Sequence, residues 1–376
     1  MAGFYRCGIL LLLVLMGNCA VSEAQNSQPR SEPGLKTEWE RVLAAAKEEG
    51  KVVVLGPPGA AVRRALTENF EKLFPGIAVE YSGSTGSTMA PKLLSERRSG
   101  YYLADLHIGN PGTILTSLLP AGALDSIRPT LILPDVVDPQ KWWQGQLDFA
   151  DQAGQYNLVF SSNVMSHVAT NPQLVNKEQF RSYSDLLDPK WRGKITMSDP
   201  TIMGPGLGTL TFWYNHPDLG KEFVGRLLTQ QKVTFSRENR QVLEWIARGE
   251  HLLALGPDDL MATELRAKGL PIEPVHSDQF KEGGLLNAGF GSVVLINRAP
   301  HPNAAKAYIN WLLTKEGQTA WSKASGYPSR RLDVSRDQFK PGELPKEGVS
   351  YLYGYNEKYA TMRAETLKFA KELLGR

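Results

Sequence analysis

Strands and helices alternate along the first third of the chain. Residues 51–55 (KVVVL) form a continuous apolar run ended by GPPG, which is typical of a buried parallel strand followed by a loop. A helical spacing then covers 61–73, and an apolar run at 77–81 predicts a second strand. This strand–loop–helix order continues through the segments 89–98, 104–108 and 113–119. Such alternation predicts an α/β lobe with a mainly parallel sheet.

A second lobe is expected downstream of a strand at 156–160. Its elements are a strand at 195–197, helices near 207–214, 221–230 and 241–248, and short strands at 252–255 and 272–275. The apolar run at 289–297 indicates a strand that returns to the first lobe, followed by helices at 301–313 and 316–323 and a long terminal helix at 351–374. We therefore expect lobe 1 at 36–150 plus 288–333, lobe 2 at 155–287 and a helical tail at 334–376, with two crossover strands between the lobes.

The N-terminus has the order of a secretory leader. Arg6 precedes an apolar run, and small and polar residues follow as far as Ala24. The run is shorter than the roughly 18 apolar residues of a membrane span. We expect a signal peptide at 1–24 cleaved after Ala24, and an exported protein. Cys19 offers an alternative, because its surroundings loosely resemble a lipoprotein signal, although Asn18 departs from the small residue usual before the acylated cysteine.

Composition excludes some classes of partner. Charged residues are 22% of the 376, and the formal net charge is +3. This balance is too mild and too dispersed to indicate nucleic acid or an anionic membrane surface. Both cysteines, Cys7 and Cys19, lie in or beside the leader, so no disulfide is expected in the mature protein.

Residues 184–200 (SDLLDPKWRGKITMSDP) mark the entry to the second lobe. Ser184 is expected to cap a one-turn helix that Asp188-Pro189 ends, and Trp191 supplies an apolar anchor before the strand. This run closely resembles the "DLLDPKWKGKI" segment of bacterial extracellular solute-binding proteins, the receptors of ABC importers. The resemblance is to the branch that includes the periplasmic ferric-ion-binding proteins.

Three further segments extend the resemblance. Residues 299–318 (APHPNAAKAYINWLLTKEGQ) are similar to "HPNAAKAFIDWLLSPEGQ" of the same receptors, YPSRR at 327–331 is similar to the family's "YPVR" ending, and ADLHIGN at 104–110 stands where the family has "ADVF". The resemblance implies a two-lobed type II periplasmic-binding-protein fold with the ligand cleft between the lobes. It also implies a periplasmic receptor that delivers a small solute to ABC permease subunits in the inner membrane.

The first candidate site lies in the lobe 1 loop that follows the second strand. In open α/β sheets ligands bind beyond the carboxyl ends of strands. This loop precedes a helix and offers Ser82, Ser84, Thr85 and Gly86, whose hydroxyls and amides suit an anion near the positive end of a helix dipole. A plain helix cap is the alternative. Asn110, after the next strand, is a further candidate, with a structural asparagine turn as its alternative.

Lobe 2 contributes a second glycine-rich loop, at 203–209, which also precedes a helix. The resemblance implies that its backbone amides hold an anion, so Gly204 and Gly206 are candidates. Asn239 occupies a similar polar position before the helix at 241–248. Arg237 and Arg240 flank it, with an ordinary surface role as the alternative. We expect the two loops, which contain no Lys or Arg, to hold the anion mainly by amides and hydroxyls.

Ferric iron is the alternative cargo that the resemblance raises. The ferric-binding branch holds iron with a histidine, a glutamate and two adjacent tyrosines, hard ligands suited to that ion. The corresponding positions here are Gly59, Asn110 and Asp259-Leu260, so we expect no metal. Tyr101-Tyr102 lies in lobe 1, in the wrong place. Asp259, with the preceding Asp258, stays a candidate ligand contact, and a helix cap is its alternative.

A secreted enzyme on the same fold is the competing class of function. The six histidines show no HExxH or other close ligand pairing, and the chain has neither a G-x-S-x-G elbow nor a Walker loop. We therefore expect no catalytic residue and no cofactor. The expected protein is a monomeric receptor for a small organic or phosphorylated anion.

Overall fold

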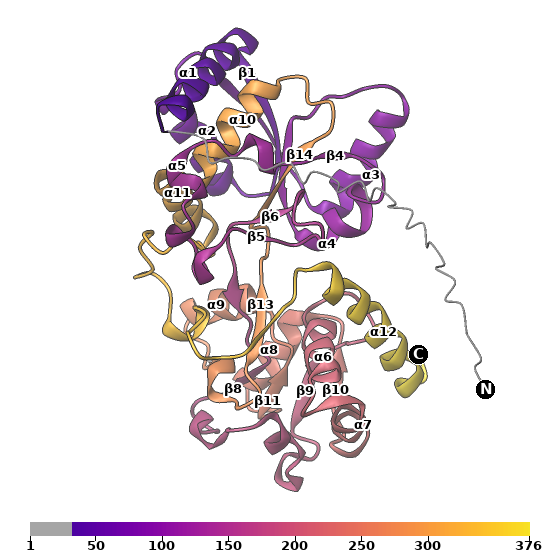
Figure 1. Ribbon diagram of the computed structural model, residues 1–376. Coiled ribbons are helices and arrows are strands. Elements are labelled where there is room, and N and C mark those ends of the chain that lie inside the picture. The colour runs from indigo at the N-terminus through magenta and orange to yellow at the C-terminus, as the bar shows by residue number, and fades with distance from the viewer. Residues whose placement is uncertain (1–31) are drawn as a thin grey trace, which may run out of the picture.

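The computed structural model describes residues 32–376, so the predicted leader and the alternative anchor at Cys19 lie outside the described residues. Figure 1 shows two lobes, one above the other, joined at a narrow waist by strands. Each lobe is a β-sheet covered by helices, which confirms the predicted two-lobed α/β fold. Within residues 32–376, no helix is long and apolar enough to cross a membrane.

Lobe 1, the upper lobe in Figure 1, is built on a seven-stranded mixed sheet. Its strands are β1 (Lys51–Gly56), β2 (Ala78–Gly83), β3 (Leu106–Gly109), β4 (Leu124–Asp125), β5 (Asp148–Phe149), β6 (Leu158–Val159) and β14 (Ser292–Ile296). Their order is β2-β1-β3-β14-β6-β5, with β4 on β14. β1 pairs in parallel with β2 and β3, as predicted, whereas β14 is antiparallel to β3 and β6. The first sheet thus includes β6, a few residues beyond the predicted start of lobe 2 at residue 155.

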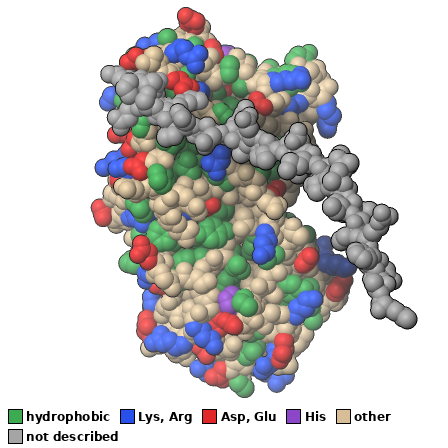
Figure 2. Space-filling view, in the orientation of Figure 1, with side chains coloured by type: hydrophobic (Ala, Val, Ile, Leu, Met, Phe, Trp, Pro, Cys, Tyr) green, Lys and Arg blue, Asp and Glu red, His purple; other side chains and the backbone are tan. Residues whose placement is uncertain are grey.

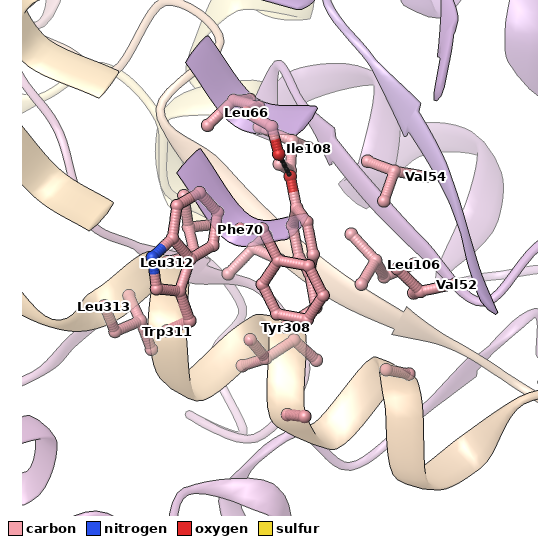
Figure 3. Packing of buried hydrophobic residues seen from close by; sticks show 14 of the residues in the cluster. Val52, Val54, Leu66, Phe70, Leu106, Ile108, Tyr308, Trp311, Leu312 and Leu313 are labelled. Atoms are coloured by element: carbon pink, nitrogen blue, oxygen red, sulfur yellow. Dashed lines mark hydrogen bonds between the residues drawn. The ribbon is translucent and has the colours of Figure 1, made fainter. Parts of the chain in front are cut away.

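Helices cover both faces of this sheet. They are α1 (Glu32–Glu49), α2 (Ala60–Leu73), α3 (Gly86–Arg98), α4 (Pro111–Thr113) with a π-helical turn at Ile114–Leu118, α5 (Pro134–Val137), α10 (Pro302–Leu313) and α11 (Lys315–Ser325). Figure 3 shows the core between α2, α10 and the sheet: the Phe70 ring lies 4.9 Å from Tyr308 and 5.3 Å from Trp311, centroid to centroid. The Tyr308 hydroxyl donates to the Leu66 carbonyl at 3.0 Å, so this buried polar group is satisfied.

Lobe 2 is built on a five-stranded sheet of order β10-β9-β11-β8-β12. Its strands are β8 (Val168–Thr170), β9 (Ile195–Ser198), β10 (Thr234–Ser236), β11 (Leu253–Leu255) and β12 (Glu273–Val275). Its helices are α6 (Pro205–Asn215), α7 (Gly220–Gln230), α8 (Asn239–Ala247) and α9 (Asp259–Ala267). β9, β10 and β11 are parallel, so their carboxyl ends meet at one edge, where the loops before α6 and α9 begin.

The segment that marks the entry to lobe 2 forms two short 3₁₀ helices, Tyr183–Leu187 and Pro189–Trp191. The predicted cap at Ser184 is wrong. Ser182 caps the first of them, because its hydroxyl accepts from the Ser184 amide and the Asp185 carboxylate accepts from the Ser182 amide. Trp191 is buried and its ring stacks on Phe180 at 5.6 Å, as expected for an apolar anchor. The other 3₁₀ helices are Arg128–Thr130, Pro139–Lys141, Trp143–Gly145, Lys177–Gln179, Ser277–Gln279 and Pro341–Glu343.

The waist is a three-stranded sheet of β7 (Asn163–Val164), β13 (Gly284–Asn287) and β15 (Tyr351–Tyr353), in the order β15-β13-β7. β7 and β13 belong to the two segments that cross between the lobes. β15 belongs to the C-terminal tail, so the predicted continuous helix over 351–374 is wrong at its start. Tyr351–Tyr353 pairs in parallel with Gly284–Leu286, and the helix α12 (Glu357–Leu374) begins only afterwards.

Both arginines of the YPSRR segment are buried, and Arg330 fixes this waist. Arg330 donates to the Ser162 hydroxyl at 3.2 Å and the Tyr355 hydroxyl at 2.9 Å, and its guanidinium lies 3.2 Å from the Asp148 carboxylate. It therefore ties a crossing segment, the edge of the lobe 1 sheet and the tail together. Arg331 lies within lobe 1 and pairs with the carboxylates of Asp135 and Asp333, both at 2.9 Å.

Candidate functional site

A cavity of about 890 Å³ lies at the waist and is lined by both lobes. Lobe 2 contributes the starts of α6 and α9, the waist contributes β7 and β13, lobe 1 contributes Tyr327 and Pro328, and the tail contributes α12. Figure 2 shows apolar side chains gathered at the left of the waist, while charged side chains cover the two ends of the molecule. The cavity is large enough for a small organic ligand.

The glycine-rich loop before α6 forms one wall, through Gly204, Pro205 and Gly208. Gly206 does not line the cavity and packs instead against Ser198 and Gly256. A Cβ on Gly206 would lie 2.0 Å from the Ser198 carbonyl oxygen, and one on Gly256 would lie 2.7 Å from the Gly206 Cα. Small residues are therefore required where the first turn of α6 packs on the ends of the lobe 2 strands. This packing brings the amino end of α6, which attracts negative charge, to the cavity.

Two acidic residues, Asp258 and Asp259, line the cavity at the start of α9. Asp258 caps the helix, since its Oδ1 accepts from the Met261 amide at 3.0 Å, and its Oδ2 accepts from Asn239 at 3.4 Å. The Asp259 carboxylate accepts from the Ser166 amide at 3.3 Å. Burial raises the pKa of Asp259 to about 7, and the neighbouring charge of Asp258 acts in the same direction. A cation near Asp259 would restore its charged form.

Other titratable side chains share the cavity. Burial raises the pKa of Tyr327 to about 12, helped by the charges of Asp258 and Asp259. Burial also raises the pKa of Glu343 and lowers the pKa of His276. These shifts have one main cause, the loss of water around groups that line the same space. Perturbed pKa values of this kind are typical of functional clefts.

Four basic side chains line the cavity: Arg266, Lys323, Lys340 and Arg363. None was predicted as a contact, because an isolated basic residue has the sequence signature of an ordinary surface residue. Arg266 faces the Glu273 carboxylate at 3.9 Å. Arg363 follows Tyr359 by one helical turn, so the available signal was its spacing from an aromatic residue on the buried side of α12.

The lobe 1 candidates lie outside the cavity lining. Ser82 and Thr85 are exposed, and the Thr85 hydroxyl lies 3.0 Å from the Ser87 hydroxyl. Gly86 is buried against Thr113, and a Cβ on Gly86 would lie 2.5 Å from the threonine hydroxyl oxygen. Ser84 is half-buried. The structure thus places this loop beside Thr113 of α4.

Asn110 has two structural bonds. Its Nδ2 donates to the Gly289 carbonyl at 3.0 Å, and its Oδ1 accepts from the Gly112 amide at 2.8 Å, which caps α4. The asparagine-turn alternative therefore describes its role in the structure. Of the lobe 2 candidates, Gly204 and Asp259 line the cavity, while Gly206 and Asn239 support residues that do.

The two arginines that flank Asn239 point to other carboxylates. Arg237 lies 3.4 Å from Asp199, and Arg240 lies 3.5 Å from Glu244. Neither lines the cavity. Gly59, which the resemblance aligns with the iron-binding histidine of the ferric-binding branch, is exposed in lobe 1. Across residues 32–376, no group of three or more His, Cys, Asp or Glu side chains is arranged to hold a metal ion.

Comparison with known proteins gives the family. The family model of the bacterial extracellular solute-binding proteins matches residues 135–348. The chain belongs to this family. The match begins within α5 of lobe 1 and covers all of lobe 2, the return strand and the YPSRR segment.

Two curated relatives match part of the chain. A protein of Haemophilus influenzae, described only as uncharacterised, is 25% identical over 189 residues, which cover 45% of this chain and 48% of that protein. A putative 2-aminoethylphosphonate-binding periplasmic protein of Salmonella typhimurium is 25% identical over 197 residues, which cover 50% of this chain and 58% of that protein. The chain spans about half the length of the curated relatives it matches.

Solved structures show the same fold over nearly their whole length. Iron-bound HitA of Pseudomonas aeruginosa has a TM-score of 0.60 at 20% identity, over 86% of this chain and 99% of HitA. AfuA of Actinobacillus pleuropneumoniae, solved with fructose-6-phosphate, has a TM-score of 0.59 at 18% identity. The match covers 87% of this chain and 99% of AfuA. A putative extracellular solute-binding protein of Bordetella parapertussis has a TM-score of 0.66 at 17% identity, over 87% of this chain and 98% of that protein. These similarities confirm the fold and leave the ligand open.

Proposed function

We propose that this protein is the extracytoplasmic receptor of an ABC importer and captures a small organic or phosphorylated anion between its lobes. The observation that carries the proposal is the cavity of about 890 Å³ into which both lobes, the waist and the tail all project side chains. A ligand held there would contact both lobes at once, so its binding would favour a closed arrangement. Membership of the solute-binding family supports the same role.

The charges of the cavity narrow the ligand class. The amino end of α6 and basic side chains such as Arg363 suit a negative group, and the carboxylates of Asp258 and Asp259 suit a positive one. A zwitterion, with an oxyanion and an ammonium group, matches both walls. The Salmonella relative is named for 2-aminoethylphosphonate, which has this chemistry, so this compound is the first candidate.

The lobe 1 loop that carries Ser82, Ser84, Thr85 and Gly86 is proposed as a contact formed on closure. Gly86 packs against Thr113, whose neighbour Gly112 lies next to Arg363 of the cavity wall. The loop is therefore separated from Arg363, which lines the cavity, by the start of α4. Movement of the lobes toward each other would bring its hydroxyls to the ligand.

The cell biology follows from the same proposal. The leader-like N-terminus favours export to the periplasm, and the family's usual partners are ABC permease subunits in the inner membrane. We propose a monomer without a cofactor or catalytic residue. A secreted enzyme stays the competing class, and ferric iron the competing cargo.

A thermal-shift screen of the purified protein tests the ligand class. The compounds are 2-aminoethylphosphonate, fructose-6-phosphate, citrate, inorganic phosphate, neutral sugars and ferric citrate. At 100 times its dissociation constant, a ligand adds about 2.7 kcal/mol to the free energy of unfolding. Stabilisation by a phosphonate or phosphate compound supports the proposal. Stabilisation by ferric citrate with no response to citrate or the organic anions would replace the anion with iron.

Turnover separates the receptor from an enzyme. The compound that stabilises the protein is incubated with it for hours and then analysed for products. A receptor returns the compound unchanged. Product formation that scales with protein concentration would support the enzyme instead.

A further inference from the structure

We infer that Arg363, on the C-terminal helix α12, binds the oxyanion group of the ligand, a carboxylate, phosphate or phosphonate. The inference rests on the proposed function, since it assigns a role within the same cleft. It goes further by making α12, which lies outside the sheets of both lobes, a part of the binding site. Three observations carry it, namely position, reach and charge pairing, and the chemistry of the side chain supports it.

The position of Arg363 is at the cavity, on the side of α12 that faces the protein. Tyr359, Gly208 and Arg363 all line the cavity. Tyr359 is buried, and its hydroxyl donates to the Gly208 carbonyl at 2.9 Å. Residues four apart lie on one face of a helix, so the anchored Tyr359 fixes the direction in which Arg363 points. Figure 1 shows α12 beside α6 and directly below α4.

The guanidinium reaches across the gap between the lobes. An ideal Cβ on Gly112, at the start of α4 in lobe 1, would lie 3.4 Å from the Arg363 Nη2. The body of α12 packs on lobe 2, where Tyr214 and Phe369 lie 4.9 Å apart, centroid to centroid. Arg363 therefore extends from a helix seated on lobe 2 to the surface of lobe 1. A ligand oxyanion bound by this side chain lies between the two lobes.

Charge pairing sets Arg363 apart from Arg330, Arg331 and Arg376. Arg330 has Asp148 at 3.2 Å, Arg331 has Asp135 at 2.9 Å, and Arg376 has Asp199 at 2.8 Å. Among the described residues, no carboxylate oxygen lies within 4.0 Å of Arg363. The side chain is partly buried, so its charge is less well hydrated than that of a fully exposed arginine. An oxyanion is the group that would compensate it.

The chemistry of the side chain suits this role. A guanidinium presents paired N–H donors whose geometry matches two oxygens of a carboxylate, phosphate or phosphonate. Lysine keeps the charge but loses the paired donors. The carboxylates of Asp258 and Asp259 line the same cavity and carry the opposite charge. A zwitterion would therefore orient with its ammonium group toward them and its oxyanion toward α12.

Three variants test the inference. Arg363→Met removes charge and donors, Arg363→Lys keeps the charge, and Lys371→Met removes one positive charge from an exposed position on the same helix. Each protein is titrated calorimetrically with 2-aminoethylphosphonate and with inorganic phosphate, at low and high salt. The melting temperature without ligand reports whether each variant is folded.

We expect Arg363→Met to weaken binding at least tenfold and to reduce its salt dependence, because a charge-assisted hydrogen bond is lost. Arg363→Lys should fall between this variant and the parent, and Lys371→Met should bind within twofold of the parent. Equal binding by the parent and Arg363→Met would overturn the inference and leave the proposed function intact. If the parent binds neither probe nor any other organic anion, the proposed function fails and the inference fails with it.

Discussion

Asp259 is the residue whose environment has the clearest functional meaning. Its pKa of about 7 lies above the ordinary value of 3.8, so between pH 4 and pH 7 the folded protein holds a proton that the unfolded chain has released. The free energy of unfolding therefore decreases as pH rises through this window, by about 1.4 kcal/mol per unit of pKa difference over the whole titration. Asp258, Tyr327 and Glu343 line the same cavity, and the charges of Asp258 and Glu343 also raise the pKa of Asp259.

Asp259→Asn should remove that decrease. Its amide oxygen still accepts from the Ser166 amide, and it carries no charge at pH 8. We expect the variant to become more stable relative to the parent as pH rises from 5 to 8, as measured by urea unfolding at each pH. A constant difference between the two proteins across this range would show that Asp259 titrates normally.

Arg331 gives the residue-scale prediction for stability. The fully buried guanidinium pairs with Asp135 and Asp333 and donates to the Leu313 carbonyl at 2.9 Å. Arg331→Met leaves the Leu313 carbonyl without its donor and removes the ion pairs with Asp333 and the half-exposed Asp135, so the free energy of unfolding should fall by about 2 kcal/mol. The control is Arg248→Met, whose exposed side chain pairs with Glu244 and Glu250 and should contribute less than about 1 kcal/mol. Urea unfolding of both variants measures the difference.

At the scale of elements, the loop before α3 carries a prediction about the ligand. Ser84→Ala with Thr85→Ala removes two hydroxyls from lobe 1 while the Thr85 side chain makes no capping bond to α3. If the loop closes onto the ligand, affinity for the compound identified by the screen should fall about tenfold, measured by calorimetry. Unchanged affinity would mean that the loop serves only as the start of the helix.

The order of helices and strands follows from local patterns, and these predicted it well. β1, α2, α6, α7 and α10 each lie within a residue or two of their expected bounds. β15 was missed because its partner, β13, is distant in sequence, and only that pairing makes Tyr351–Tyr353 a strand. Long-range pairing overrides a helical pattern of three or four residues.

The candidate site shows the same limit. The approach of α6 to the cavity could be predicted, because a glycine-rich loop at the end of a strand leads into the helix. The role of the tail could not, since the direction in which Arg363 points depends on the bond from Tyr359 to Gly208 in lobe 2. Asn110 illustrates the opposite case, a polar residue at the right strand end whose side chain already bonds to the Gly289 carbonyl and the Gly112 amide.

At the scale of the whole molecule, the waist and the tail determine how the lobes can move. β7 and β13 cross between the lobes, and α12 begins at lobe 1, where the Glu357 carboxylate accepts from the Gln152 amide at 2.6 Å. We expect the ligand identified by the screen to reduce the radius of gyration in X-ray scattering. Binding without such a change would mean that the ligand enters an arrangement that is already closed.

The two ends of the described chain lie on different lobes. Glu40 is exposed on α1 in lobe 1, and Lys371 is exposed near the end of α12, which is seated on lobe 2. Residues 32–376 contain no cysteine, so Glu40→Cys and Lys371→Cys would be two unique thiols within this part of the chain. A donor and an acceptor dye attached there would turn lobe movement into a change in energy transfer, so the protein is suited to conversion into a fluorescent sensor for its own cargo.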